Sequence, residues 1–147
     1  MPTRALITGA SGMVGSHLAE YLLDETKWEI DLLLRYRSPL ENLHRIVPIA
    51  NEGRVFRFLY ADLRDELSIR AAVKVSRPQY VFHLAAQSFP QASFSAPLDT
   101  YDTNIQGTHR LLEALREYAP EAMIHVCSSS EVYGRVPKER LPITEDC

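Results

Sequence analysis

Near its start the chain reads Ala5-Leu6-Ile7-Thr8-Gly9-Ala10-Ser11-Gly12-Met13-Val14-Gly15, which joins a short apolar run to an amphipathic run through three glycines. This order predicts a strand, a tight turn and a helix. Gly9 would allow the turn, Gly12 would let a phosphate approach the backbone, and Gly15 would let the helix pack closely on its strand. The stretch therefore predicts a cradle for a dinucleotide diphosphate, held by N–H groups at the helix start. The alternative is a structural corner without a ligand.

Length and composition limit the class of the protein. The 147 residues are 46% hydrophobic, which is enough for one globular domain with a packed core. The formal net charge is −3 and the basic residues are scattered, so we expect no nucleic-acid or membrane-surface partner. The N-terminus shows no leader pattern and no apolar run approaches the length of a spanning helix, so a cytoplasmic protein is expected. The two cysteines do not suggest a disulfide framework, and Cys127 is expected to be buried.

Apolar runs alternate with helical patterns along the whole chain, without an internal repeat. This alternation predicts an α/β fold, a Rossmann-type doubly wound parallel sheet with helices on both faces, formed by one domain spanning residues 1–147. Ligands bind such sheets beyond the carboxyl ends of the strands. The expected strands are 5–8, 29–34, 55–60, 80–85 and 123–128. The expected helices follow Gly12 (with Val14, Leu18 and Leu22 on one face) and span 39–46, 66–75 and 104–118 (with Ile105, Leu111, Leu112 and Leu115 on one face).

The motifs that follow these strands occur in a recognisable order. They are the glycine turn at 8–15, Asp62-Leu63, the run His83-Leu84-Ala85-Ala86-Gln87-Ser88, Asn104 with Gly107-Thr108, and the run 128–134 around Ser129-Ser130-Glu131. Together they resemble the extended short-chain dehydrogenase/reductase family over essentially the whole chain. Within it they are most similar to the nucleotide-sugar 4,6-dehydratases, in particular those that act on GDP-mannose.

The resemblance implies a role for each motif. A nucleotide-diphosphate sugar, expected to be GDP-mannose, would be the substrate of a homo-oligomeric enzyme. Asp62 and Leu63 would flank the adenine, and Asn104 would touch the nicotinamide side or else cap its helix. Gln87 and Ser88 would face the substrate, although a loop serine is also a common turn former. The cofactor diphosphate would lie on Thr8, Gly9, Ser11, Gly12, Met13, Val14 and Gly15, and the path to the nicotinamide would be lined by Leu84, Ala85 and Ala86.

The end of the second strand indicates which cofactor is used. A carboxylate there would bind the ribose 2′-hydroxyl of NAD, whereas arginine would pair with the 2′-phosphate of NADP. The chain has Arg35, Arg37 and Ser38 at this point, and Asp31 lies inside the strand, where it is interpreted as a solvent-facing position. NADP is therefore favoured and NAD is the alternative. The two arginines could also be ordinary solvated cations.

Ser129, Ser130 and Glu131 follow the last predicted strand and are the candidate catalytic residues. The resemblance implies that Glu131 takes the C5 proton of the sugar and that Ser129 polarises the 4-oxygen. A partly desolvated carboxylate has a raised pKa and suits such a base. A serine and a glutamate after a strand are also typical of a capping turn. A 4-epimerase or 4-keto reductase is the alternative activity.

No tyrosine of the chain has a lysine four residues later, although the family's general base is such a pair. The chain therefore resembles the N-terminal part of a longer enzyme, with a sheet that is incomplete at its C-terminus. By itself it is expected to be inactive and prone to association, because its last strand would be an unpaired edge. A non-catalytic dinucleotide-binding module is a further alternative. The histidines are not spaced as metal ligands and are interpreted as structural, so no metal site is expected.

Overall fold

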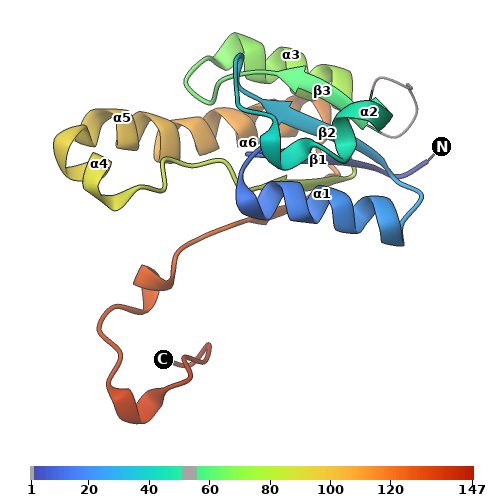
Figure 1. The fold of residues 1–147 in the computed structure, drawn as a ribbon. Coiled ribbons are helices and arrows are strands. Elements are labelled where there is room, and N and C mark those ends of the chain that lie inside the picture. The colour runs from blue at the N-terminus through green and yellow to red at the C-terminus, as the bar shows by residue number, and fades with distance from the viewer. Residues whose placement is uncertain (1, 51–55) are drawn as a thin grey trace.

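Five parallel strands form one sheet in the order β3-β2-β1-β4-β5 (Figure 1). The structure is a computed structural model that describes residues 2–50 and 56–147. This strand order reverses between β1 and β4, which is the switch point of a Rossmann sheet, so the predicted fold class is confirmed. The strands are β1 (Arg4–Thr8), β2 (Glu29–Leu34), β3 (Phe56–Tyr60), β4 (Tyr80–His83) and β5 (Met123–Val126).

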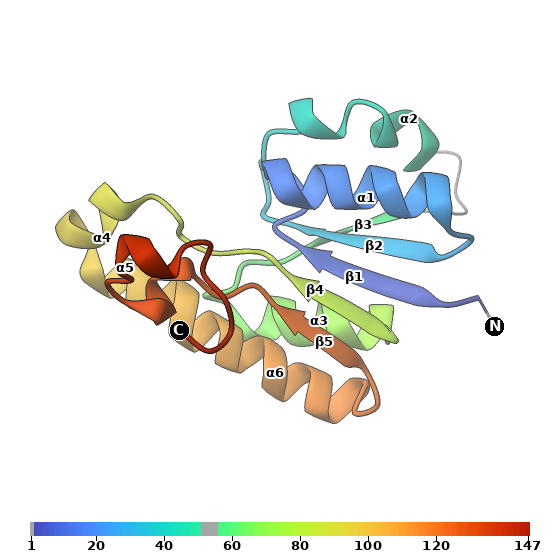
Figure 2. The same cartoon turned by 90° about the horizontal axis from the view of Figure 1, so that it is seen from below.

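Helices cover both faces of the sheet, with α1 and α2 on one side and α3 and α6 on the other (Figures 1 and 2). The segment between β4 and α6 contains two short helices and one π-helical turn. The helices are α1 (Met13–Glu25), α2 (Ile46–Ala50), α3 (Glu66–Ser76), α4 (Pro90–Ser95), α5 (Pro97–Tyr101) and α6 (Gly107–Tyr118). The short 3₁₀ and π turns are η1 (Glu41–Leu43), η2 (Asp102–Gln106, π), η3 (Ser130–Tyr133) and η4 (Lys138–Arg140).

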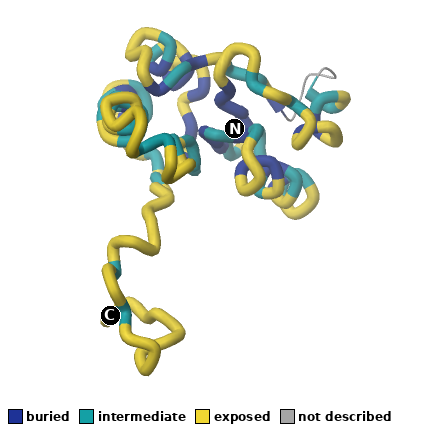
Figure 3. The backbone as a smooth tube through the Cα atoms, turned by 60° about the vertical axis from the view of Figure 1, so that its left-hand side comes forward, coloured by how far each residue is buried: buried dark blue, intermediate teal, exposed yellow. Residues whose placement is uncertain are grey.

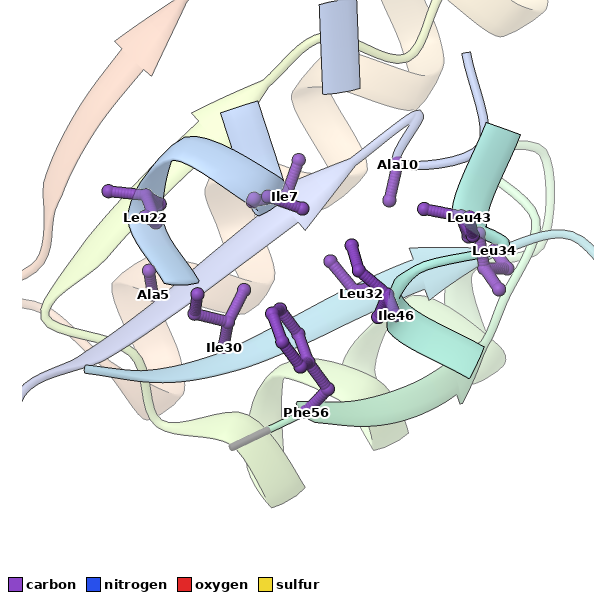
Figure 4. Packing of buried hydrophobic residues seen from close by; sticks show 11 residues of the cluster. Ala5, Ile7, Ala10, Leu22, Ile30, Leu32, Leu34, Leu43, Ile46 and Phe56 are labelled. Carbon is purple, nitrogen blue, oxygen red and sulfur yellow. The ribbon is translucent and has the colours of Figure 1, made fainter. Parts of the chain in front are cut away.

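The sheet separates two hydrophobic cores. Ile7 of β1 points into the core beneath α1, whereas Leu6 points into the core beneath α3 and α6. In β1 and β2, successive residues after the first are therefore all buried, as in a sheet covered on both faces. Figure 4 shows the first of these cores, which contains Ala5, Ile7, Ala10, Ala19, Leu22, Ile30, Leu32, Leu34, Leu43, Ile46 and Phe56.

Several predicted boundaries differ from the structure. Strands β4 and β5 end two residues earlier than expected, and residue 55 lies outside the described residues. The predicted helix at 39–46 is only the short turn η1 followed by α2, and Leu43 and Ile46 are its fully buried residues in the core. The predicted helix at 104–118 begins as an α-helix at Gly107, after the π-helical turn.

The predicted apolar faces of the helices are partly wrong. Val14 and Leu112 are exposed, because each lies next to the narrow stripe that its helix buries rather than on it. Ile105 is exposed as well, since it lies in the π-helical turn η2, in which no residue is buried. Cys127 directly follows β5 and is exposed as well, because β5 forms an edge of the sheet that the described residues build. Met123, in that edge strand, is 67% exposed.

Asp31 does not face solvent, in contrast to the sequence interpretation. Asp31 is fully buried. Its carboxylate oxygens accept hydrogen bonds from Nε and Nη2 of Arg57 over 2.6 and 2.7 Å. Asp31 pairs in register with Arg57 on β3 and with Leu6 on β1, and Nε of Arg4 lies 4.0 Å from its carboxylate. The strand register thus supplies the cations that compensate a buried charge.

The residues after β5 run away from the sheet as an extended, mostly exposed segment (Figures 1 and 3). This segment contains the turns η3 and η4. In the part of the chain that the structure describes, no helix is long and apolar enough to cross a membrane.

Candidate functional site

A cleft of about 460 Å³ opens at the carboxyl ends of β1, β2, β3 and β4. This is where ligands bind in open α/β sheets. The residues that line it come from the end of β2, from the segments after these four strands and from the segment between β4 and α6. They are Gly9, Ser11, Gly12, Leu33, Leu34, Arg35, Ser38, Ala61, Asp62, Leu63, Arg64, Leu84, Ala85, Ala86, Gln87, Ser88, Phe89, Asp99 and Thr103.

Two glycines of the first turn have no room for a side chain. Gly9 has a φ of 68°, and a Cβ built on it would lie 2.9 Å from the backbone N and Cα of Ala85. A Cβ on Gly15 would lie 2.8 Å from Cα of Ala10, because α1 crosses directly over the turn. The spacing of these glycines thus reflects close backbone packing of the turn against the loop after β4 and against α1. Met13, Val14 and Gly15, which were also expected to hold the diphosphate, belong to α1 and do not line the cleft.

The N-terminus of α1 lacks the groups that normally satisfy a helix start. Its N-cap, Gly12, has no side chain, and no acidic residue lies in its first turn. Helix α3 is different, since Asp65 accepts hydrogen bonds from the N–H groups of Leu67 and Ser68, and Glu66 lies in its first turn. The positive end of α1 therefore remains available to an anion in the cleft.

The loop after β2 contributes cations to the same cleft. Arg35 and Ser38 line it, and they also line an adjoining hollow of about 450 Å³ together with Arg37, Tyr36 and Tyr60. Arg37 has a φ of 65°, a strained conformation for a residue with a side chain, and its guanidinium lies 6.0 Å from the ring centroid of Tyr36. Asp62, Arg64 and Asp65 line the same hollow, so it contains carboxylates as well as guanidinium groups.

Arg64 forms ion pairs at the rim of the cleft beside the loop after β2, where Asp62 and Arg64 line the same hollow as Arg35. Nη2 of Arg64 lies 3.0 Å from Asp62, and its Nη1 lies 2.8 Å from Asp99 of α5. The hydrogen bond from the Arg64 side chain lowers the pKa of Asp62, and the two carboxylates raise the pKa of Arg64. Asp62, which the family resemblance places beside the adenine, is therefore expected to be ionised at neutral pH.

The loop after β4 is held by the side-chain amide of Asn104, which forms two hydrogen bonds with the backbone of Gln87. Oδ1 of Asn104 accepts a hydrogen bond from the N–H of Gln87 over 2.7 Å, and its Nδ2 donates to the carbonyl of Gln87 over 3.0 Å. The side chain of Gln87 donates to Thr100 and accepts from the N–H of Phe89. Asn104 lies inside η2, so the alternative that it caps a helix is wrong. Its contact with the cofactor stays a prediction.

Comparison with known proteins identifies the family. A family model described as GDP-mannose 4,6 dehydratase matches residues 6–147. The chain belongs to the NAD(P)-dependent epimerase/dehydratase family of the short-chain dehydrogenases/reductases. The family resemblance in the sequence is thus confirmed.

Individual members of this family match most of the chain. A probable dTDP-glucose 4,6-dehydratase of Sinorhizobium fredii is 36% identical, over 89% of this chain and 39% of that protein. A GDP-mannose 4,6-dehydratase of Vibrio cholerae is 37% identical, over 92% of this chain and 38% of that protein. The solved structure of a UDP-glucose 4-epimerase from Bifidobacterium longum in complex with NAD+ and UDP superposes with a TM-score of 0.81 at 30% identity, covering 98% of this chain and 42% of the epimerase. The chain thus spans about two fifths of the length of these family members.

The candidate catalytic residues are not part of the cleft at the carboxyl ends of the strands. Ser129, Ser130 and Glu131 are exposed on the extended segment and do not line the cleft. Oγ of Ser129 accepts a hydrogen bond from the N–H of Glu131 over 3.2 Å and caps the turn η3. The capping alternative therefore describes this local geometry, and their catalytic role stays a prediction.

Sequence reasoning missed Arg64 and Asp99 at the rim and Phe89 and Thr103 in the lining. Arg64 follows the Asp62-Leu63 motif directly, so its position next to that motif could have indicated that it lies at the cleft. Its partner Asp99 lies 35 residues away, and no local pattern indicates that contact. Thr8 was assigned to the diphosphate but is fully buried beneath the cleft, where its hydroxyl contacts the loop after β4.

Proposed function

We propose that this chain forms the NADP-binding part of a nucleotide-sugar 4,6-dehydratase that acts on GDP-mannose. One observation supports it most strongly: the uncapped N-terminus of α1 faces a cleft that also contains Arg35 and Ser38. A diphosphate would be held by the helix start, and a 2′-phosphate by the arginines. The family model and the GDP-mannose 4,6-dehydratases among the relatives support the choice of reaction.

The residues present fit such a cofactor, because the first turn of α1 is uncapped and its N-cap, Gly12, lines the cleft together with Arg35 and Ser38. When bound, NADP would accept a hydride from C4 of the sugar and return it at C6. Leu84, Ala85 and Ala86 would lie beside the nicotinamide, and Asp62 and Leu63 beside the adenine. Gln87 and Ser88 would adjoin the substrate.

Water elimination would depend on the segment after β5. The carboxylate of Glu131 would remove the C5 proton, which the neighbouring 4-keto group acidifies, and would donate that proton to the C6 hydroxyl as the C6–O bond breaks and water leaves. The hydroxyl of Ser129 would donate to the oxygen at C4, and Ser130 would contact the sugar beside it. Because these residues lie outside the cleft in the described structure, the proposal requires the segment to approach the cleft when substrate binds.

A 4-epimerase is the second candidate, and the similarity to the UDP-glucose 4-epimerase structure favours it. Incubation of the full-length protein with NADP and GDP-mannose distinguishes the two. A dehydratase yields a 4-keto-6-deoxy sugar nucleotide that is lighter by one water in mass spectrometry, whereas an epimerase yields a product of unchanged mass. Failure to turn over any nucleotide sugar, with NADPH still bound, would instead favour a dinucleotide-binding module.

A further inference from the structure

His83 occupies the centre of a hydrogen-bond network beneath the cleft. It is the last residue of β4 and is only 4% exposed. Its Nδ1 lies 2.8 Å from Oγ1 of Thr8 on β1, and its Nε2 lies 2.9 Å from Oγ1 of Thr108 on α6. Both ring nitrogens are therefore engaged, each by a hydroxyl from a different element.

The partners of the two hydroxyls determine where the protons lie. Oγ1 of Thr8 accepts hydrogen bonds from the N–H groups of Leu84 and Ala85, each over 3.1 Å. Its two lone pairs are then used, so its own proton must be donated to Nδ1 of His83. Oγ1 of Thr108 donates to the carbonyl of Asn104 over 2.7 Å, so it can accept the proton of Nε2. The network thus selects a neutral imidazole that is protonated on Nε2.

This network holds both ends of the loop that lines the cleft. At one end Thr8 binds the N–H groups of Leu84 and Ala85, and the backbone of Ala85 packs directly against Gly9. At the other end Asn104, whose carbonyl binds Thr108, clamps the backbone of Gln87. His83 joins these two anchors.

We propose that His83, as the neutral Nε2–H tautomer, is a positioning residue that sets the geometry of the cofactor cleft through Thr8 and Thr108. This inference rests on the proposed dinucleotide binding. Protonation of His83 would place a second N–H against Thr8, whose hydroxyl would have to turn a lone pair towards it and release a backbone N–H of the loop. The loop from Leu84 to Gln87 would then lose an anchor, and cofactor affinity would fall at acid pH.

The surroundings of the ring support a neutral state at physiological pH. Burial lowers the pKa of His83 from its ordinary value, because the charged form loses hydration. Among the described residues, the titratable or polar groups that face the ring are the hydroxyl of Thr8 from β1 and that of Thr108 from α6, and no charged side chain contributes to the shift. The ring is therefore expected to be half protonated only at a pH below 6.5, the ordinary pKa of histidine.

Two measurements on the full-length protein test the proposal. Long-range ¹H–¹⁵N NMR spectra of the imidazole should show the Nε2–H tautomer at neutral pH. Calorimetric titration with ADP-ribose, which has no group that titrates between about pH 5 and pH 8, should show constant affinity at neutral pH and a decline below 6.5. ADP-ribose avoids the 2′-phosphate of NADP, which itself titrates in this range.

Variants separate positioning from mere folding. His83→Asn keeps an acceptor near Thr8 but cannot be protonated, so its affinity for ADP-ribose should stay near that of the unmutated protein and lose the acid decline. His83→Leu leaves Thr8 without an acceptor and should bind about three- to tenfold more weakly at every pH, as expected for one lost hydrogen bond. His109→Asn, on the exposed side of α6, is the matched control and should retain the acid decline.

An Nδ1–H or charged ring at pH 7 would overturn the proposal, even if a variant fails to fold. So would an acid decline in His83→Asn equal to that of the unmutated protein. If the unmutated protein binds neither ADP-ribose nor NADP at any pH, the proposed function itself fails and this role fails with it. Normal binding without an acid decline would contradict the role of His83 alone.

Discussion

The side-chain amide of Asn42 donates a hydrogen bond to the backbone carbonyl of Ser11 over 2.9 Å. Asn42 lies in η1, just after the loop with Arg35 and Ser38, and its neighbour Leu43 is fully buried in the core beneath α1. The N–H of the same Ser11–Gly12 peptide donates to the carbonyl of Gly9 over 3.0 Å. This peptide is thus held from both sides, and the loop after β2 is tied to the glycine turn.

Replacing Asn42 with alanine should weaken binding of ADP, because the Ser11–Gly12 peptide would lose one of its two anchors. One neutral hydrogen bond corresponds to a loss of about two- to tenfold in affinity. Isothermal titration with ADP measures this, and Glu41→Ala, in the same turn, is the control. Equal ADP affinities for Asn42→Ala and Glu41→Ala would show that the contact does not matter for binding.

Replacing Arg37 with alanine should weaken the binding of NADPH by about 1.5–3 kcal/mol, the contribution of a charged hydrogen bond. The binding of NADH should be nearly unchanged. The reason is that only NADPH carries the 2′-phosphate that the hollow beside Arg35 and Arg37 would hold. Fluorescence titration of both cofactors tests it. Arg45→Ala is the control, since Arg45 pairs with Glu20 and does not line the cleft or the hollow. Equal affinity of the unmutated protein for NADPH and NADH would contradict the NADP assignment.

Replacing Glu131 with glutamine in the full-length protein should lower formation of the 4-keto-6-deoxy product by roughly two to four orders of magnitude, as for a lost acid–base group. Binding of NADP should persist. The measurement is incorporation of solvent deuterium at C5 of the sugar, and Glu139→Gln on the same extended segment is the control. Product of the unmutated enzyme without deuterium at C5 would point to an epimerase or a reductase.

Replacing Asp31 with alanine should destabilise the fold by about 3 kcal/mol, the lower end for breaking a buried ion pair, because Arg57 keeps partial access to water. Urea unfolding of the variant gives the value. Glu29→Ala is the comparison, since Glu29 and its partner Arg4 are both partly exposed, and it should cost at most about 1 kcal/mol. Similar unfolding free energies for the two variants would show that the burial of Asp31 has little energetic consequence.

Much of the fold and part of the cleft could be predicted because their signals are local. The turn at Gly9, Gly12 and Gly15 follows a strand directly, and the loops after the strands meet at one edge in any parallel sheet. The exposure of Cys127 and Ile105 was not predictable in this way. Whether an apolar residue is buried depends on which neighbouring element covers it, and β5 has a partner on one side only.

The sequence by itself determined the strand, turn and helix at the start of the chain and the alternation of strands and helices after it. It also determined which polar residues and glycines follow the strands and so reach the cleft. Each of these features depends on spacing within a few residues. Only the tertiary structure decided the partners of the polar groups. Asp31 meets Arg57 across 26 positions, and His83 meets Thr8 across 75. Such contacts arise from the register of parallel strands, which is set by packing on both faces of the sheet rather than by neighbouring residues along the chain.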